Sequence, residues 1–348
     1  MSETTGRRQS VRISDVAAAA GVSKALVSYA LNDRPGVKES TRAHIVSVAR
    51  SMGWTPSLRG RALSSSRAYA IGLVFETLPE TLAGDQYFTS LMAGLQSVLS
   101  TSQYSLVTEV VHEPGAEVAA YRRLASEGRV DGMVLVDLHR DGDPRFDILV
   151  EHELAFVSLG RPPAATDMPV MLYDESDAIS DVIEHLASLG HKRIAQVVGP
   201  QAGVSARVRR ELYQRELRER GLDDSWWVES DYTAIGGRAA TERLLAHEDP
   251  PTAIIYSNDL MAVAGMGTAF QSGLRIPEDL SVVGWDDITV AQYLHPALST
   301  VTQHPFEDGR LAAALLLEAV DGRRFSEPVW TQNPRFVPRE STGPVSFR

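Results

Sequence analysis

The segment 12–67 constrains the fold most strongly, because it combines helical periodicity with helix caps and a glycine turn. Ser14 and Ser23 are expected to cap two short helices on either side of Gly21. A third helix is expected from about Glu39 to Met52. Inward-facing apolar residues at helical spacing are Val16, Ala17, Ala20, Leu26, Val27, Ala30, Leu31, Ile45, Val48, Ala49 and Met52. A helix, a tight turn and a second helix form the spacing of a DNA-binding unit.

Charge divides the chain at the same place. Residues 1–70 contain 11 Lys and Arg against 4 Asp and Glu, a net charge of +7. The whole chain carries −11, so the remaining 278 residues carry −18. A basic head on an acidic body is typical of a nucleic-acid-binding module attached to a soluble sensor. A merely basic tail is the alternative, but a tail would lack the apolar periodicity of the head.

Composition excludes several other classes. The chain has no cysteine, which excludes disulfides, cysteine metal sites and a thiol nucleophile, and suits a reducing compartment. Residues 1–10 lack the apolar core of a secretory signal, and no uncharged apolar run approaches the roughly 18 residues of a membrane helix. We therefore expect a cytoplasmic protein without membrane contact. The length allows a head plus one or two ordinary domains.

The head resembles the DNA-binding domain of the lac repressor (LacI/GalR) family. The resemblance rests on the runs DVAAAAGVSKALVSYALN and VKESTRAHIVSVARSMGWTPS. Two positions depart from the family pattern: Leu26 stands where threonine is usual, and Tyr29 stands where arginine is very frequent. The operator preference is therefore expected to differ from that of the arginine-bearing members.

The same resemblance implies roles for the exposed face of the second helix. Lys24, Ala25 and Tyr29 match positions that read bases, and small and polar residues at the N-terminal end of such a helix allow close entry into the major groove. Positions that hold phosphates match Ser23, Ser28 and Asn32. The alternative for Tyr29 is a packing aromatic at the edge of the head.

Residues 56–63 match the hinge helix of the family. The segment is too short to be a stable helix alone in water, so the resemblance implies that it orders when two copies pack together on DNA. Leu63 matches a leucine that wedges into a base step from the minor groove, and Arg61 is placed for nearby phosphates or the groove floor. Gly60 replaces the usual alanine, at a cost of roughly 1 kcal/mol in helix stability. A linker leucine without a wedge role is the alternative for Leu63.

From Tyr69 onward, short apolar runs alternate with helix-length segments such as Phe88–Ser100 and Ala178–Leu189. The runs predicted as strands are Ala70–Phe75, Ser105–Val111, Gly132–Val136, Ala155–Leu159, Val170–Tyr173, Ile194–Val198, Ala253–Tyr256 and Leu280–Val283. This alternation predicts parallel sheets with helices on both faces. The strands are too many for one small sheet, so we expect two lobes with a ligand cleft between them.

The body also resembles the periplasmic-binding-protein-like core of the same family. The matching runs include RVDGMVLVD, HLASLGHKRIAQVVGP, IIYSNDLMAVAGMG, LSVVGWDD and PALSTVTQHPFEDG. The resemblance implies that the chain crosses between the lobes three times. Lobe one would hold about 69–161 and 303–330, and lobe two about 162–302 and 331–348.

Two local motifs that match the family imply effector-binding residues in this chain. Asn258 in SND and Asp286 in GWDD match residues that bind hydroxyl or ring-nitrogen groups of a ligand. Arg209 matches the arginine of a family segment in which Leu212 replaces the usual glycine. The alternatives are a helix cap for Asp286 and a surface helix charge for Arg209.

Three aromatic residues complete the implied ligand cage. Tyr87 and Phe88 match an aromatic pair of lobe one, and Tyr232 matches an aromatic that packs on the ligand. Aromatic faces with several hydrogen-bonding groups suit sugars, and they also suit nucleobases. Plain core packing is the alternative for the lobe-one pair.

An enzyme is the competing class. Gly265 and Gly267 form only half of a dinucleotide fingerprint, since Phe270 stands at the third glycine and the run lies inside a predicted helix. The chain has no P-loop, its histidines are scattered, and Asp286 and Asp287 are adjacent and so point apart. We expect no catalytic site, no metal and no cofactor. A secreted sugar-binding protein would share the body but would need a signal sequence in place of the head.

These observations predict a tail (1–11), a helix–turn–helix domain (12–55), a hinge helix and linker (56–68) and a two-lobed core (69–348). The fold class is thus an all-α helix–turn–helix head with a hinge helix, joined to an α/β two-lobed periplasmic-binding-protein-like core. The expected function is a ligand-responsive transcriptional repressor that binds a near-palindromic operator as a homodimer. The expected effector is a sugar or related polyhydroxylated ligand, alternatively a purine. No leucine-heptad tail follows residue 330, which favours a dimer over a tetramer.

Overall fold

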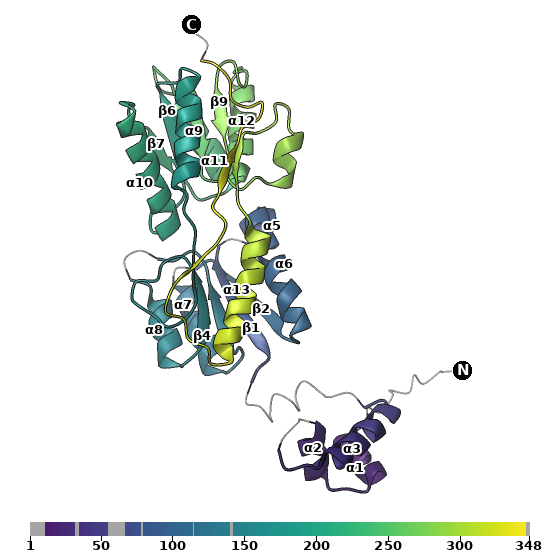
Figure 1. The fold of residues 1–348 in the computed structure, drawn as a ribbon. Helices are drawn as coiled ribbons and strands as arrows, with labels where there is room; N and C mark the ends of the chain where they lie inside the picture. The colour runs from purple at the N-terminus through teal and green to yellow at the C-terminus, as the bar shows by residue number, and fades with distance from the viewer. Residues whose placement is uncertain are drawn as a thin grey trace, which may run out of the picture. The chain divides into compact units, whose positions relative to one another are not determined.

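The computed structural model describes residues 11–31, 35–54, 67–77, 79–113, 115–139 and 142–345. The chain divides into two compact units, residues 1–69 and residues 70–348. The first is a helical head and the second is a larger α/β body (Figure 1). None of the described helices is long and apolar enough to cross a membrane.

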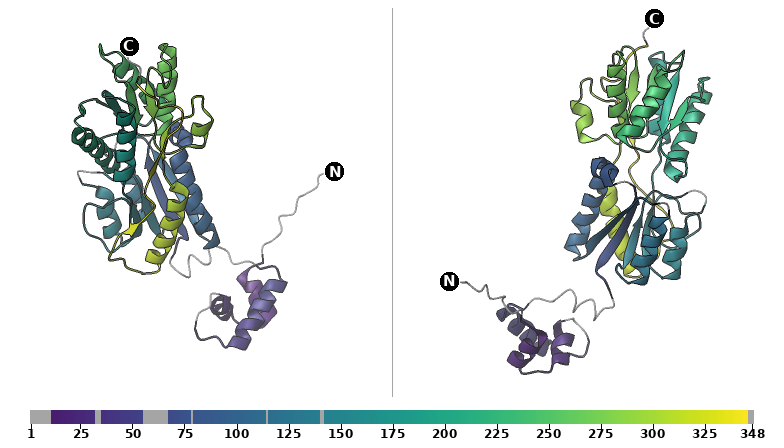
Figure 2. Two further views of the ribbon diagram at one scale, coloured as in Figure 1. Left: turned by 45° about the horizontal axis from the view of Figure 1, so that its top comes forward. Right: turned by 180° about the vertical axis from the view of Figure 1, so that it is seen from behind.

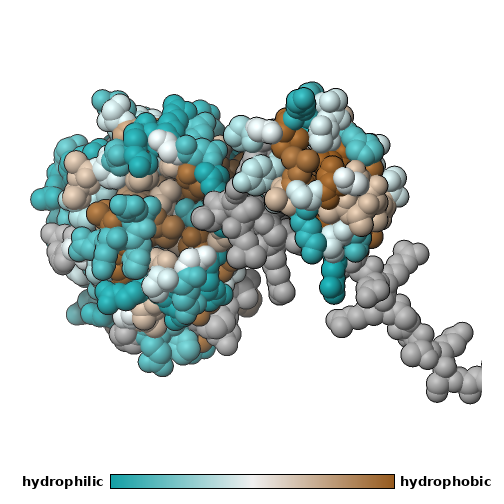
Figure 3. All heavy atoms as spheres, turned by 90° about the horizontal axis from the view of Figure 1, so that it is seen from below, coloured by the Kyte–Doolittle hydropathy of each residue, from teal (hydrophilic) through white to brown (hydrophobic). Residues whose placement is uncertain are grey.

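The head consists of three helices, α1 (Ile13–Ala20), α2 (Lys24–Leu31) and α3 (Glu39–Ser51). Its buried core is Val16, Ala17, Ala20, Val27, Ala30, Ile45 and Ala49, which confirms the predicted periodicity. The remaining predicted core residues, Leu26, Leu31, Val48 and Met52, are only partly buried. A head this small cannot enclose all of its apolar residues, and Figure 3 shows hydrophobic residues of the head among hydrophilic ones.

One of the two expected helix caps is confirmed. Ser23 Oγ accepts a hydrogen bond from the Leu26 N–H at 3.2 Å. The expectation for Ser14 is wrong, because α1 begins at Ile13 and has Arg12 at its cap position. The Asp15 carboxylate accepts from the Arg12 N–H at 2.8 Å, so it satisfies that backbone group and leaves Ser14 inside the first turn.

Lobe one of the body is built on a six-stranded parallel sheet of order β11-β5-β4-β3-β1-β2. Its strands are β1 (Ala70–Glu76), β2 (Ser105–Val111), β3 (Gly132–Leu135), β4 (Ala155–Leu159), β5 (Val170–Leu172) and β11 (Val329–Trp330). Its helices are α5 (Pro79–Gly84), α6 (Gln86–Thr101), α7 (Ala116–Ser126), α8 (Pro144–Glu151) and α13 (Pro305–Val320). Strand β1 lies between β3 and the edge strand β2, with Ile71 opposite Leu106 of β2 and Gly132 of β3.

Lobe two contains a four-stranded parallel sheet of order β7-β6-β8-β9 (Figure 2). Its strands are β6 (Ile194–Val198), β7 (Trp227–Glu229), β8 (Ala253–Tyr256) and β9 (Ser281–Val283). Its helices are α9 (Ser176–Ser188), α10 (Val204–Glu219), α11 (Ala234–Leu245), α12 (Asp259–Gln271) and the short 3-10 helix η1 (Thr289–Tyr293). The antiparallel pair β10 (Thr300–Thr302) and β12 (Arg335–Val337) continues this lobe through bridges from Val283 and Asp286.

All eight apolar runs that were predicted as strands fall on strands, and the chain crosses between the lobes three times. The crossings follow β5, β10 and β11. The expected first crossing near residue 161 is wrong, because Ser158 of β4 pairs with Val170 of β5. Strand β5 therefore belongs to lobe one, and the chain leaves that lobe only after Leu172.

Helices α6 and α13 of lobe one pack backbone to backbone. A Cβ atom on Gly94 of α6 would overlap the carbonyl oxygen of Phe306, and a Cβ atom on Gly309 of α13 would overlap the carbonyl oxygen of Leu91. Only glycine allows so close an approach. The contact fixes these two helices relative to each other, and their first turns both face lobe two.

We predict that Gly94→Ala destabilises the body, because the added methyl group forces the two helices apart. Overpacking of this kind costs about 1–3 kcal/mol, which thermal unfolding of the full chain would record as a lower melting temperature. Gly267→Ala is the matched control, since that glycine is exposed in α12 and a Cβ atom added there would meet nothing within 4 Å. The control should be neutral or stabilising by up to roughly 1 kcal/mol. Equal melting temperatures for Gly94→Ala and the parent would contradict the packing argument.

Candidate functional site

The exposed face of α2 carries the residues that the sequence assigns to base reading. Lys24, Ala25 and Tyr29 are exposed, and Tyr29 keeps 45% of its surface accessible. Ser28 lies on the same face and is half-buried, while Ser23 precedes the helix and caps it. The structure thus groups these five positions at one edge of the head. Four further DNA-site predictions lie outside the described residues: Asn32, Gly60, Arg61 and Leu63.

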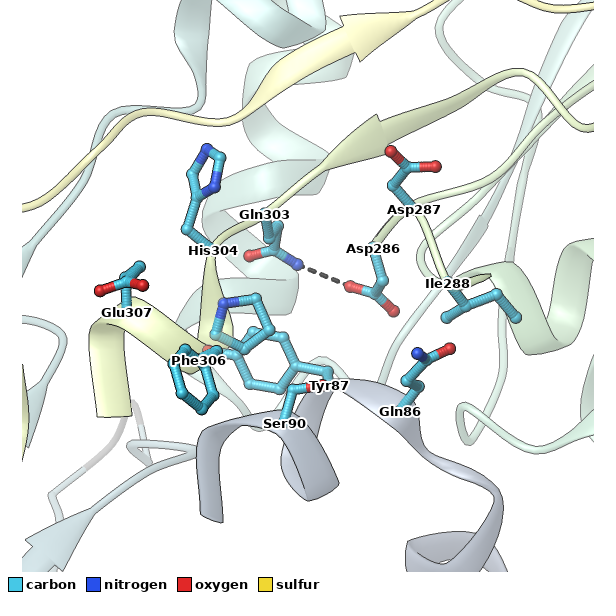
Figure 4. Close-up of a pocket in the computed structure, with 11 residues that line it drawn as sticks. Gln86, Tyr87, Ser90, Asp286, Asp287, Ile288, Gln303, His304, Phe306 and Glu307 are labelled. Carbon is cyan, nitrogen blue, oxygen red and sulfur yellow. Dashed lines mark hydrogen bonds between the residues drawn. The ribbon is translucent and has the colours of Figure 1, made fainter. Parts of the chain in front are cut away.

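A cavity of about 260 Å³ lies between the two lobes of the body. Its lining comes from three segments: Gln86, Tyr87 and Ser90 of α6, Asp286, Asp287 and Ile288 after β9, and Gln303 to Glu307 at the second crossing. Figure 4 shows the Asp286 carboxylate above Gln86 and Tyr87, with Gln303 beside it. Two of the six predicted effector residues, Tyr87 and Asp286, therefore line this cavity.

Asp286 is held in place from both sides. Its Oδ1 accepts a hydrogen bond from Gln303 Nε2 at 2.6 Å, and its N–H donates to the Val301 carbonyl at 2.8 Å. Burial raises the pKa of its carboxyl group well above the ordinary value, and the carboxylates of Asp259 and Asp85 raise it further. Asp286 does not cap η1, whose cap residue is Ile288 without a side-chain hydrogen bond.

Tyr87 owes its position to the cap of α6. Asp85 Oδ1 accepts from the N–H groups of Tyr87 at 2.9 Å and Phe88 at 3.2 Å. The Phe88 ring packs edge-to-face on Tyr87 at 5.3 Å and on Phe75 at 5.0 Å between centroids. Phe88 is thus the packing partner that supports Tyr87, and only Tyr87 reaches the cavity.

Arg209 is buried, which excludes the surface-charge alternative. Its guanidinium donates to Glu175 Oε1 at 2.6 Å and Oε2 at 3.2 Å, and to the Ser257 carbonyl at 3.2 Å. It also stacks over the Trp285 ring at 3.9 Å from the centroid. Burial lowers the pKa of Arg209, but the nearby Glu175 carboxylate outweighs this effect and raises it above the ordinary value, so the guanidinium stays charged.

Asn258 and Tyr232 form one unit at the start of α12. Asn258 Oδ1 accepts from the Met261 N–H at 2.9 Å and caps the helix, while its Nδ2 donates to the Tyr232 carbonyl at 2.9 Å. Tyr232 has a φ of 63°, a left-handed conformation that is uncommon outside glycine. Its ring lies over Gly199, where a Cβ atom would overlap it. Neither residue lines the cavity described above.

Sequence reasoning did not assign several residues that build the interlobe contact. The Gln86 amide makes two hydrogen bonds to Thr289 across the lobes. Its Nε2 donates to Thr289 Oγ1 at 2.7 Å, and its Oε1 accepts from the Thr289 N–H at 2.8 Å. On the other side, the Leu138 carbonyl accepts from the Val204 N–H at 2.9 Å. Asp137 precedes this contact and follows β3, so the rule that ligands bind at the carboxyl ends of parallel strands would have identified it.

One group among the described residues has the donor set of a metal site: Glu76, Glu117 and His139 offer ligand atoms within 4.8 Å of one another. Glu117 is already occupied, because its Oε1 accepts from the buried Arg145 guanidinium at 2.6 Å. Arg145 also donates to Asp143 at 2.6 Å. Glu117 and His139 are therefore part of an ion-pair network with Arg145 and Asp143 that anchors the segment after β3.

Two protein-family signatures match the chain. "Bacterial regulatory proteins, lacI family" matches residues 12–57, and "Periplasmic binding protein-like domain" matches residues 183–342. These matches confirm the expected fold class. The described helices of the head and the two α/β lobes of the body correspond to the two signatures.

Similar proteins cover almost the full length. A Bacillus subtilis protein named "Probable HTH-type transcriptional repressor ExuR" is 30% identical over 334 residues, which is 95% of this chain and 98% of the relative. The crystal structure of the lac repressor dimer bound to operator and the anti-inducer ONPF has a TM-score of 0.79 and 26% identity, covering 96% of this chain and 100% of that chain. The transcriptional regulator CelR–cellobiose complex has a TM-score of 0.70 and 29% identity, covering 95% of this chain and 99% of that chain.

These relatives are transcriptional regulators, and the match extends from the head through both lobes. The chain therefore belongs to the lacI family of bacterial regulatory proteins and is a DNA-binding transcriptional regulator.

Proposed function

We propose that this regulator is a repressor that binds a near-palindromic operator as a homodimer, and that a small sugar binds between its lobes and changes its operator affinity. The interlobe cavity carries this proposal, because both lobes contribute polar groups to it. A ligand that contacts Tyr87 of lobe one and Asp286 of lobe two stabilises one relative orientation of the lobes. The structure of the lac repressor dimer bound to operator supports the proposed dimer, and the structure of the CelR–cellobiose complex supports a sugar as the ligand.

The head supplies DNA recognition in this proposal. Lys24, Ala25 and Tyr29 read base edges in the major groove, whereas Ser23, Ser28 and Asn32 position the head on phosphates. Two heads are needed because one recognition helix reads only a few base pairs. Such a regulator acts in the cytoplasm, where bacterial operators are.

The hinge couples the head to the body in the same proposal. Residues 56–63 form a helix when two copies meet on DNA, with Leu63 as the minor-groove wedge and Arg61 near the phosphates. Gly60 lowers the stability of that helix by roughly 1 kcal/mol relative to alanine, so the hinge depends strongly on DNA for its order. In this proposal residues 12–55 are the DNA-binding domain, and residues 69–348 are the effector-binding core.

We predict that operator affinity falls steeply with salt. The net charge of +7 on residues 1–70 implies several phosphate contacts per protomer, each of which releases a counterion from DNA. Binding of the full chain to operator DNA, measured from low to physiological salt, should give a clearly negative slope of log affinity against log salt. A flat dependence would contradict DNA binding through the head.

We predict that Lys24→Ala and Tyr29→Ala weaken operator binding more than binding to random DNA. Both side chains are exposed on α2, so their removal leaves the head core intact. Each lost base contact should cost about 1–3 kcal/mol of discrimination, measured as the ratio of operator to random-duplex affinity. An equal loss on both duplexes would show that these side chains touch only phosphates.

We predict that Asp286→Asn lowers sugar affinity about tenfold or more while leaving operator affinity of the ligand-free protein intact. Leaving a buried polar group of the ligand without its hydrogen-bond partner costs about 1–3 kcal/mol. Asparagine tolerates the φ of 110° at this position better than alanine does, and it can still accept from Gln303. A thermal-shift screen of sugars and purines on the parent finds the ligand, and titration of both proteins gives the affinities. Unchanged affinity with a lower melting temperature would instead assign Asp286 a structural role.

A further inference from the structure

Two side-chain hydrogen bonds join the lobes at the edge of the interlobe cavity. Gln86 is the first residue of α6 in lobe one, and Thr289 is the first residue of η1 in lobe two. The Gln86 amide donates to Thr289 Oγ1 at 2.7 Å and accepts from the Thr289 N–H at 2.8 Å, so both ends of the amide are engaged. Gln86 lines the cavity together with Ile288, the residue before Thr289, and Figure 4 shows these two side chains next to each other.

Lobe one holds the backbone of Gln86. The Asp85 side chain caps α6 directly before Gln86, and its Oδ1 accepts from the Tyr87 N–H at 2.9 Å. Further along the helix, Gly94 brings the backbone of α6 against that of α13. Because the start of α6 is fixed in this way, a hydrogen bond to the Gln86 side chain holds lobe one as a whole.

Lobe two holds Thr289 through a buried carboxylate. Asp259 is the first residue of α12 and is fully buried. Its Oδ2 accepts from the Ile288 N–H at 2.8 Å, and its Oδ1 accepts from Thr300 Oγ1 at 2.6 Å. The residue before Thr289 is thereby tied to α12 and to β10. The hydrogen bonds between Gln86 and Thr289 therefore connect two segments that are each fixed in their own lobe.

A second contact joins the lobes at another place. The Val204 N–H at the start of α10 donates to the carbonyl of Leu138, which follows β3, at 2.9 Å. N–H groups in the first turn of a helix have no partner within that helix. Among the described hydrogen bonds, the partners of the Val204 and Thr289 N–H groups thus lie in the opposite lobe. Each of these groups is protected from hydrogen exchange while the lobes are together.

We propose that Gln86 and Thr289 are positioning residues that hold the two lobes of the ligand-free chain in one orientation. The pair acts without a ligand, because its donors and acceptors all belong to the protein. Removing the pair leaves the three crossings and the contact of Val204 with Leu138, so other orientations of the lobes gain population. The proposal concerns the body alone and goes beyond the proposed function, in which a ligand changes this orientation.

Hydrogen exchange of the full ligand-free chain, read at single amide groups, tests the proposal. Gln86→Ala removes both hydrogen bonds, and Thr289→Val removes the hydroxyl group that accepts one of them. We expect the protection of the Val204 N–H to fall at least about fivefold in Gln86→Ala and about twofold or more in Thr289→Val. The Ile288 N–H binds Asp259 within lobe two, so its protection should stay that of the parent.

Two variants control for the change of side chain. Thr289→Ser keeps the hydroxyl group, and Gln292→Ala removes a glutamine that is exposed on the same 3-10 helix. Both should leave the protection of the Val204 N–H as it is in the parent. Equal protection of Val204 in Gln86→Ala and the parent overturns the proposal. A joint loss of protection at Val204 and Ile288 also overturns it, because that pattern shows unfolding of lobe two.

Operator binding of the same ligand-free variants separates this proposal from the proposed function. If lobe orientation controls the heads, Gln86→Ala should change operator affinity by about threefold or more, whereas Gln292→Ala should not. Lower protection of Val204 with unchanged operator affinity supports the positioning role and contradicts control of the operator through lobe orientation. A changed operator affinity with the parent's protection at Val204 overturns the positioning role.

Discussion

The buried ion pair of Glu175 and Arg209 is the interaction on which the cleft side of lobe two depends. Glu175 lies where the chain first crosses from lobe one, and Arg209 lies on α10. The same guanidinium binds the carbonyl of Ser257, which follows β8, and stacks on Trp285, which follows β9. One side chain therefore joins four segments at the carboxyl edge of the sheet. Breaking a buried pair by removing one partner costs about 3–5 kcal/mol, since the other charge is left without compensation.

Backbone strain gathers at the carboxyl edges of both sheets. Asp137, Tyr232, Asp286 and Asp287 all have positive φ values although none is glycine. Such conformations cost about 1–3 kcal/mol each and persist only where the surroundings enforce them. The enforcing contacts are visible here: the Asp286 N–H binds the Val301 carbonyl, and Arg339 holds the Asp287 carboxylate. The strained loops are thus fixed before a ligand arrives, which lowers the ordering cost of binding.

The sequence predicted the parts of this structure that local periodicity determines. The core of the head and all eight apolar strands follow from the spacing of their apolar residues. Strands β7, β10, β11 and β12 escaped prediction because each has only two or three residues, lies in no longer apolar run, and takes its place from the strands beside it. The cap at Ser14 failed because Asp15, one residue further, satisfies the free N–H of the helix start.

Some residues of the candidate site were also predictable from local sequence motifs, whereas others were not. Tyr87 and Asp286 were found from motifs, and both line the cavity. Gln86, Gln303 and Glu175 were not assigned, because each acts through a partner far away in sequence and no local pattern marks it. Asn258 caps α12 through its Oδ1 and binds the Tyr232 carbonyl through its Nδ2, and its contact with a ligand stays a prediction. Tertiary pairing, not residue type, decides which polar groups remain available to a ligand.

In the proposed mechanism, lobe one transmits the effect of ligand binding in the cavity to the head. Strand β1 begins at Ala70, directly after the head unit, and it ends at Glu76 on the cleft edge. Helix α6 carries Tyr87 and is fixed to α13 by the glycine contact at Gly94 and Gly309. Close-packed elements move together as a rigid body and do not deform. A change in the angle between the lobes therefore moves lobe one as a unit, and the start of β1 moves with it. In a dimer two such starts move together, so a ligand that never touches DNA changes the spacing at which two heads must bind.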